Sequence, residues 1–230
     1  MIDLSQPLIA QEQMDAPDLS PDIYAAVLRD LSRVNRLTMA ARPTLGFLER
    51  VARWGEPLRI LDIGYGAGDM LRTVARWSAK RGIRTELTGI DLNPNSMAVA
   101  RAATPVEMGI NFITGDYADL RHREWDVILS SLVAHHMTRC ELIHFLQFMD
   151  EAAQRGWLIN DLLRHRLAHL GYPLLARMMR WHRIVREDGT LSIARSFRPQ
   201  EWPPILDEAG ITDARVFRAF PFRLCVERCR

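Results

Sequence analysis

Short apolar runs alternate with amphipathic stretches through the middle of the chain. Between the runs, apolar residues recur at spacings of three and four, which is typical of one face of a helix. Strands that are apolar on both sides and alternate with helices favour a mostly parallel sheet covered on both faces. The pattern therefore predicts an open α/β fold whose first five strands lie near residues 58–63, 84–90, 110–114, 125–130 and 156–160.

The two ends of the chain do not follow this alternation. Residues 1 to about 20 are polar, contain three prolines and lack periodicity, so we expect a flexible arm there. Helical spacing over residues 22–54 predicts two helices, with Pro43 and Gly46 between them. We expect four regions: an arm with two helices (1–54), an α/β core (55–161), a helical cap inserted after the fifth strand (162–197), and a closing helix with an antiparallel strand pair (198–230).

The composition narrows the class of protein. A chain of 230 residues that is 48% hydrophobic and 25% charged is typical of one globular domain. No apolar run approaches the roughly 20 residues that cross a bilayer, and the first residues do not resemble a signal peptide, so we expect a cytoplasmic protein. The net charge of +2 gives no strong attraction for nucleic acid or membranes.

A glycine-rich motif follows the first predicted strand, where residues 61–69 read Leu-Asp-Ile-Gly-Tyr-Gly-Ala-Gly-Asp. Glycines let the backbone turn sharply from strand to helix and approach a ligand closely. Asp91 ends the second strand, where a carboxylate can accept hydrogen bonds from both hydroxyls of a ribose. Asp116 follows the third strand, where it can accept from an adenine amino group, and the fourth strand ends in small polar residues.

These motifs together resemble the class I methyltransferases that use S-adenosylmethionine (SAM). Residues 62–68 match the D-x-G-x-G-x-G signature, and residues 125–129, W-D-V-I-L, resemble a later motif. The resemblance implies an α/β fold with a seven-stranded sheet of order 3-2-1-4-5-7-6, strand seven being antiparallel. It also implies SAM as the cofactor, bound by Asp62, Gly64, Gly66, Gly68, Asp91, Leu92, Asp116, Tyr117 and Ser131.

A nicotinamide dinucleotide is the main alternative ligand for such a loop. Its usual fingerprint is G-x-G-x-x-G, whereas here the third glycine comes one position early and Asp69 follows it. A carboxylate at the start of a helix would repel a pyrophosphate. SAM has no phosphate and carries an ammonium and a sulfonium group, so the sequence favours SAM.

The methyl acceptor is expected beyond the carboxyl ends of strands four and five. His135 and His136 follow strand four, and Asp161 ends strand five. A histidine is a suitable base for a phenol or an enol. His136 is the first candidate and His135 the second, while Asp161 either orients a histidine or acts as the base itself. Adjacent residues on a turn point differently, so we expect one histidine to face the cleft. Capping of the next helix, or packing at its start, is an equally weighted role for the two histidines.

The expected cap is rich in Leu, Met and Arg, and Gly171 and Pro173 interrupt its helical pattern. An apolar cap favours an apolar or aromatic acceptor. The cap resembles bacterial small-molecule methyltransferases, some encoded beside type III polyketide synthases, which implies a phenolic acceptor. His165 and His169 lie four residues apart but lack a third ligand at matching spacing, so we expect no metal.

We therefore predict a SAM-dependent enzyme that methylates an oxygen of a small aromatic or phenolic molecule. Three alternatives stay open: a carbon methyltransferase of the quinone type, an RNA methyltransferase that uses the arginines of the cap, and a SAM-binding protein without catalysis. The expected partner is the small acceptor rather than nucleic acid or a membrane, and a homodimer is left open.

Overall fold

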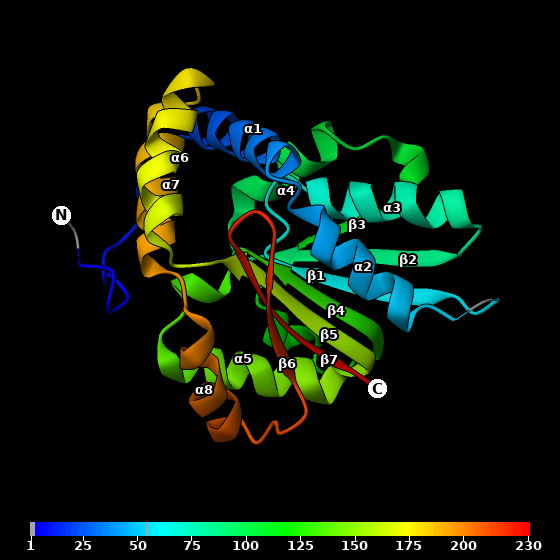
Figure 1. The fold of residues 1–230 in the computed structure, drawn as a ribbon. Helices are drawn as coiled ribbons and strands as arrows, with labels where there is room; N and C mark the ends of the chain where they lie inside the picture. Colours follow the sequence, from blue (N-terminus) through cyan, green and yellow to red (C-terminus); the bar gives the residue numbers. More distant parts are fainter. Residues whose placement is uncertain (1–2, 54) are drawn as a thin grey trace.

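A computed structural model describes residues 3–53 and 55–230 of the protein (Figure 1). Within these ranges seven strands form one sheet in the order β3-β2-β1-β4-β5-β7-β6. The first five strands run parallel, and β7 is antiparallel to both β5 and β6. The predicted fold class and strand order are confirmed. The strands are β1 (Leu58–Ile63), β2 (Thr85–Asp91), β3 (Asn111–Thr114), β4 (Trp125–Ser131), β5 (Ala153–Leu162), β6 (Arg215–Ala219) and β7 (Arg223–Cys229).

Helices cover both faces of the sheet, as the alternating pattern predicts (Figure 1). On one face α5 (Arg139–Ala152) and α8 (Trp202–Glu208) bury a core that includes Phe145, Trp157 and Trp202. On the other face α2 (Ala41–Val51), α3 (Asp69–Arg81) and α4 (Pro94–Ala102) pack on the sheet. Five short 3-10 helices connect these elements in the described ranges: η1 (Gln13–Asp15), η2 (Val106–Met108), η3 (Tyr117–Leu120), η4 (Ala134–His136) and η5 (Pro199–Glu201).

A third group of helices lies beyond the carboxyl ends of the parallel strands. There α1 (Pro21–Leu37) packs against α6 (Arg166–Met178) and α7 (Arg183–Arg195), with Val27 and Trp181 in their shared core (Figure 1). The expected helical cap after strand five is thus formed by α6 and α7. The expected break within it is wrong, because α6 runs through Gly171 and Pro173. Pro173 removes one backbone hydrogen bond, and burial of Ala168 and Ala176 on the packed face offsets that loss.

The boundary between the two amino-terminal helices also differs from the expectation. Pro43 and Gly46 lie inside α2, and the chain turns before it at Met39, whose φ is 51°. Pro43 is in the first turn of α2, where its missing N–H has no partner within the helix in any case. The closing helix predicted at residues 198–210 begins as η5 and continues as α8.

The described part of the expected flexible arm, residues 3–20, packs along α7. The backbone N–H of Leu8 donates to the carbonyl of Ala194 at 3.1 Å. The N–H groups of Gln13 and Met14 donate to the two carboxylate oxygens of Asp188 at 3.1 and 2.9 Å. These bonds place η1 against the carboxyl end of the sheet. Among the helices of the described chain, none is both long and apolar enough to cross a membrane.

Candidate functional site

The glycine motif forms the loop between β1 and α3. Gly64, Gly66 and Gly68 have φ values of 76°, 50° and 72°, in the left-handed region that favours glycine. A Cβ atom on Gly64 would lie 2.3 Å from Cγ2 of Val133. The loop therefore needs glycine at this position both for its backbone angle and for its close approach to the segment after β4.

Asp91 lies at the end of β2, beside this loop. Its Oδ2 accepts a hydrogen bond from the N–H of Gly66 at 2.8 Å, and its Oδ1 accepts from the N–H of Asn93 at 2.9 Å. Burial raises the pKa of Asp91 above its ordinary value, and these hydrogen bonds oppose that effect. Each carboxylate oxygen has more than one acceptor position, so both oxygens keep a position for a ligand hydroxyl.

Asp62 is buried beneath the loop, and no described residue forms a hydrogen bond with its Oδ1. Burial first, and then the neighbouring charges of Asp69 and Asp91, raise the pKa of Asp62 well above its usual range. Three carboxyl groups thus gather around the glycine loop. This cluster of acidic groups fits a ligand with cationic groups, as SAM has, because a nearby cation would favour ionisation of the carboxyls, and it disfavours a pyrophosphate.

A cavity of about 620 Å³ opens beyond the carboxyl ends of the strands. That volume lies in the range of small-molecule sites. Of the predicted site residues, those that line the cavity are Gly64, Gly66, Asp91, Leu92, Tyr117, Ser131, His135 and His136. Four others lie outside its lining: Asp62, Gly68, Asp116 and Asp161. Asp116 is exposed and accepts from the N–H of Ala118 at 2.9 Å, so its adenine role stays a prediction.

Asp161 holds His135 in a fixed orientation. The Nδ1 atom of His135 lies 2.7 Å from Oδ1 of Asp161, and the backbone N–H of His135 donates to Oδ2 at 3.1 Å. Both side chains are only 2% exposed. The orienting role considered for Asp161 is therefore the one that its geometry supports, rather than direct contact with the acceptor.

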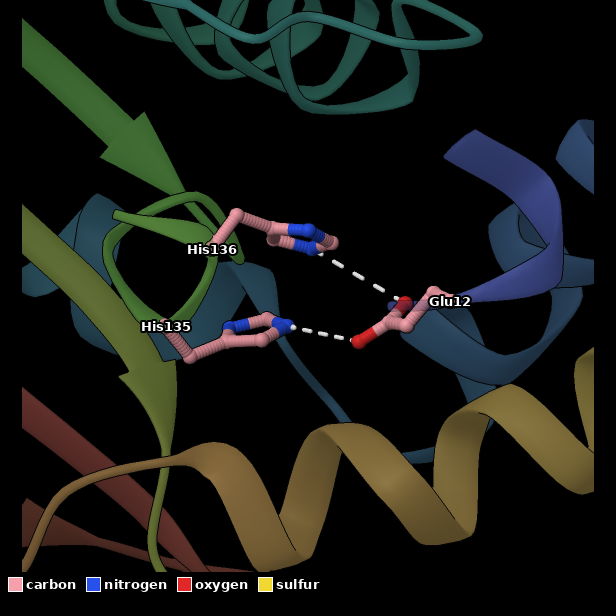
Figure 2. A group of neighbouring side chains, drawn as sticks. All are labelled: Glu12, His135 and His136. Carbon is pink, nitrogen blue, oxygen red and sulfur yellow. Dashed lines mark ion pairs between the residues drawn. The ribbon is translucent and has the colours of Figure 1, made fainter. Parts of the chain in front are cut away.

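Glu12, on the segment just before η1, meets both histidines (Figure 2). Its Oε1 is 3.5 Å from Nε2 of His135, and its Oε2 is 3.8 Å from Nε2 of His136. The Nδ1 atom of His136 lies 3.0 Å from Oδ2 of Asp15. Both histidines thus line the cavity, contrary to the expectation that one would face it, because both rings project from η4 toward Glu12 (Figure 2).

The carboxylates around His135 control its protonation. Burial by itself would lower the pKa of His135, but the charge and hydrogen bond of Asp161, with the nearby charge of Glu12, outweigh burial and raise it to about 9. Burial opposes ionisation of Glu12 and Asp161 as well, yet their interactions with the histidines lower the pKa of both. At neutral pH His135 is therefore an imidazolium between two carboxylates.

The helix that follows is capped by residues other than the histidines. Thr138 and Glu141 form a capping box at the start of α5, as the sequence predicts. The N–H of Thr138 donates to Glu141 at 2.8 Å. Thr138 and Glu141 therefore cap α5, and the two histidines do not have the capping role that was considered for them.

Sequence reasoning missed Glu12, Asp15 and Arg223 at this site. The first two lie in a polar segment without periodicity, and no local pattern relates them to His135 and His136. Arg223 starts β7, lines the cavity and is buried, and its Nη1 atom has no hydrogen-bond partner among the described residues. Arg223 is one of three charged residues in β7 and stands at its first position, so no local signal in the sequence singles it out.

Several arginines of the cap take part in ion pairs within the protein. Arg164 is buried and pairs with Glu201. Arg195 lies 3.6 Å from Glu12, and Arg183 lies 2.9 Å from Glu187. These pairs reduce the charge available to bind phosphates, which weakens the case for an RNA-binding face.

Comparisons with known proteins agree with this geometry. Residues 60–156 match the family model described as a methyltransferase domain. A putative O-methyltransferase from Nostoc punctiforme superposes with a TM-score of 0.67 at 15% identity, over 98% of this chain and 64% of its own. Human N-acetylserotonin methyltransferase in complex with SAM gives 0.63 at 16% identity, over 92% of this chain. A SAM-dependent methyltransferase from Aquifex aeolicus gives 0.63 at 18% identity, over 91% and 98% of the two chains.

The similar structures differ in length. The present chain spans 56% of the human enzyme, whereas it spans nearly all of the Aquifex protein. No curated protein matches the sequence. The family model extends from β1 into β5, which includes the glycine loop and Asp91. Residues 60–156 therefore match a methyltransferase domain, and the chain has the fold of the SAM-dependent methyltransferases named above.

Proposed function

We propose that the protein transfers the methyl group of SAM to an oxygen atom of a small aromatic acceptor. One observation carries the proposal: a single cavity is lined both by the glycine loop with Asp91 and by His135 and His136. A cofactor held at the loop and an acceptor held at the histidines would therefore lie in one enclosed space. Methyl transfer depends mainly on such proximity and alignment.

The residues at the loop fit SAM. Asp91 keeps acceptor positions for the two ribose hydroxyls, and the carboxyl groups of Asp62 and Asp69 lie beside the loop, where a cationic group of the ligand would favour their ionised forms. SAM, when bound, supplies a methyl carbon activated by a positively charged sulfur. The task of the protein is then to hold the acceptor oxygen in line with this carbon and to remove its proton.

His136 is our candidate for the group that takes this proton. Its side chain is 27% exposed and lines the cavity, and Asp15 holds its Nδ1. His135 is less suitable, because its pKa of about 9 keeps it protonated at neutral pH. Its positive charge instead stabilises an acceptor that has become an anion.

The walls on the acceptor side favour an aromatic molecule. The cap and the β6–β7 turn contribute mainly apolar and aromatic side chains there, and they are Leu167, Tyr172, Leu175, Val185, Ile193 and Phe222. Apolar walls with a few polar groups are the usual composition of a site for a ring compound. The similar structures named above include an enzyme whose substrate is in its name, N-acetylserotonin, and a putative O-methyltransferase. A phenolic hydroxyl is accordingly the first acceptor to test.

The test is methyl transfer from SAM labelled in its methyl group to a panel of phenols, quinols and structured RNA. We expect a phenol to gain the label as a methyl ether, with one S-adenosylhomocysteine formed per ether. Label on ring carbon would favour the carbon methyltransferase, and label in RNA would favour the RNA methyltransferase. Binding of a nicotinamide dinucleotide without binding of SAM would overturn the proposal.

A further inference from the structure

We propose that Glu12, His135 and His136 form a binding site for a divalent transition-metal cation on the wall of the cavity. Each residue offers one ligand atom, and these atoms all lie within 4.8 Å of one another (Figure 2). The inference goes beyond methyl transfer, and it departs from our expectation of no metal, which considered only His165 and His169. The geometry supports it in four steps.

The first step is the orientation of the two rings. Asp161 holds Nδ1 of His135 at 2.7 Å, and Asp15 holds Nδ1 of His136 at 3.0 Å. Both Nε2 atoms are thereby directed to Glu12 (Figure 2). Metal-binding histidines almost always give their other nitrogen to a carboxylate or a carbonyl, which fixes the ring and its tautomer. Here both histidines have such a carboxylate.

The second step is the missing hydrogen-bond partner of Nε2 of His135. Its side chain is 2% exposed, and among the described residues its Nε2 has no hydrogen-bond partner. A buried polar atom without a partner costs free energy, so such atoms are rare in folded proteins. The neighbouring Oε1 of Glu12 is 3.5 Å away. A cation between the two atoms would give Nε2 of His135 a partner, and it would give Oε1 of Glu12, which already accepts from Ser192 at 2.8 Å, a second one.

The third step is distance. Two ligands bound to one metal ion at about 2.1 Å lie roughly 3 to 3.5 Å apart. The separations of Glu12 from the two histidines, 3.5 and 3.8 Å, are close to this range. The three ligand atoms all lie within 4.8 Å of one another, so rotations of the side chains would have to shorten the longest of these separations to bring the atoms around one ion.

The fourth step is charge. Three carboxylates, those of Glu12, Asp15 and Asp161, surround the two imidazoles, and Arg195 at 3.6 Å from Glu12 balances only part of their charge. In the metal-free protein the imidazolium of His135 supplies a second positive charge, and a divalent cation that displaced its proton would, together with Arg195, balance all three carboxylates. Two imidazoles and one carboxylate suit Zn²⁺ or Fe²⁺ better than Ca²⁺ or Mg²⁺, which prefer sites made of oxygen alone.

Such a site would have a position open to the cavity, because three protein ligands do not complete the coordination of these metals. An acceptor hydroxyl at that position would lose its proton more readily, as water does on a bound metal ion. This use of the metal, unlike its binding, rests on the proposed function. In the metal-bound protein the cation, rather than His136, would lower the pKa of the acceptor hydroxyl, and the proton would pass to solvent at the open side of the cavity.

The experiment is a titration of chelator-treated, full-length protein with Zn²⁺ by calorimetry, and with Co²⁺ by visible absorption, in the absence of SAM and acceptor. We expect one equivalent to bind tightly and Co²⁺ to develop the absorption of a site with nitrogen ligands. Glu12→Gln and His135→Gln should each weaken binding at least about tenfold, since each removes a ligand. His122→Gln removes an exposed histidine far from the cavity and should leave binding unchanged.

Folding and function are controlled separately. Thermal unfolding and SAM affinity show whether each variant keeps its fold. His136→Gln, at the more exposed ligand, provides a second test if a variant at the buried positions does not fold. A protein that binds the metal but transfers no methyl group to any acceptor would contradict the proposed function and leave the metal site standing. Absence of stoichiometric binding, or binding that all three ligand variants retain, would overturn the metal site.

Discussion

The imidazole of His135 and the carboxylate of Asp161 join the turn after β4 to the end of β5 through two contacts. One is the Nδ1–Oδ1 pair at 2.7 Å, and the other is the backbone N–H of His135 with Oδ2 at 3.1 Å. The second contact fixes the position of the carboxylate whatever the charge of the ring. Asp161 therefore positions His135 while it also stabilises the protonated ring.

The protonation of His135 predicts a pH dependence of stability. The pKa of His135 rises from 6.5 to about 9 on folding. Its contribution to the free energy of unfolding is therefore complete below pH 6.5 and is lost as the pH rises through 9. Asp161 and Glu12 have lowered pKa values and stay ionised over this range. We expect the free energy of unfolding, measured by denaturant titration with a chelator present, to fall by up to about 3 kcal/mol across it.

His135→Gln is the control for this effect, because glutamine keeps polar atoms near Asp161 but does not titrate. Its unfolding free energy should change much less over the same pH range. A wild-type protein whose stability is constant across that range would contradict the protonated state that we assign to His135.

Asp91→Ala should weaken SAM binding by at least about tenfold. The change removes the acceptor of two ligand hydroxyls, and a hydrogen bond to a charged group is worth about 1.5 to 3 kcal/mol. Glu86→Ala, on the same strand but exposed and outside the cavity, is the matched control. Calorimetry with SAM compares the two variants, and equal dissociation constants would remove Asp91 from the ribose site.

Gly64→Ala should both destabilise the protein and impair SAM binding. Its new Cβ would lie 2.3 Å from Cγ2 of Val133, at a φ of 76°. Gly82→Ala is a matched control, because its φ of 66° imposes similar backbone strain, about 1 kcal/mol, with no atom within 4 Å of the new Cβ.

Adding Val133→Ala to Gly64→Ala separates contact from strain. Gly64→Ala should lose more stability than Gly82→Ala, as measured by denaturant unfolding. The double variant should regain this additional loss. If the second change restores nothing, the close approach of Gly64 to Val133 is not the reason for glycine at that position.

His136→Ala should lower turnover on the acceptor by about 100-fold or more, which is the usual contribution of a general base. SAM affinity should change little, because the predicted SAM contacts lie at the glycine loop. His122→Ala, an exposed histidine outside the cavity, serves as control. Steady-state kinetics across a pH range provide the measurement. Unchanged turnover together with an unchanged pH profile would exclude His136 as the base.

Much of the sheet follows from patterns that are local in the sequence. The glycine motif and Asp91 each mark the end of a strand, and parallel strands bring such ends to one edge. The contact of Gly66 with Asp91 is therefore predictable. The path of α6 through Pro173 is not, because tertiary packing rather than the local signal decides whether the helix continues.

The histidine site was predictable in part. His135, His136 and Asp161 follow neighbouring strands, and this placement predicts that they lie close together. Glu12 belongs to a polar segment whose backbone is held by α7, through Asp188 and Ala194. Nothing near Glu12 in the sequence indicates which later residues it meets, so its role depends on the complete fold.

The position of Glu12 has a consequence for how the protein matures on the ribosome. Its segment is synthesised early, yet its partners His135 and Ser192 are synthesised much later, and Ser192 donates to Glu12 at 2.8 Å. The five parallel strands, which all precede Ser192 in the chain, can thus form before the wall that Glu12 completes. Closure of the pocket should be among the last events of maturation, and a nascent chain that stalls before α7 would expose an unfinished pocket.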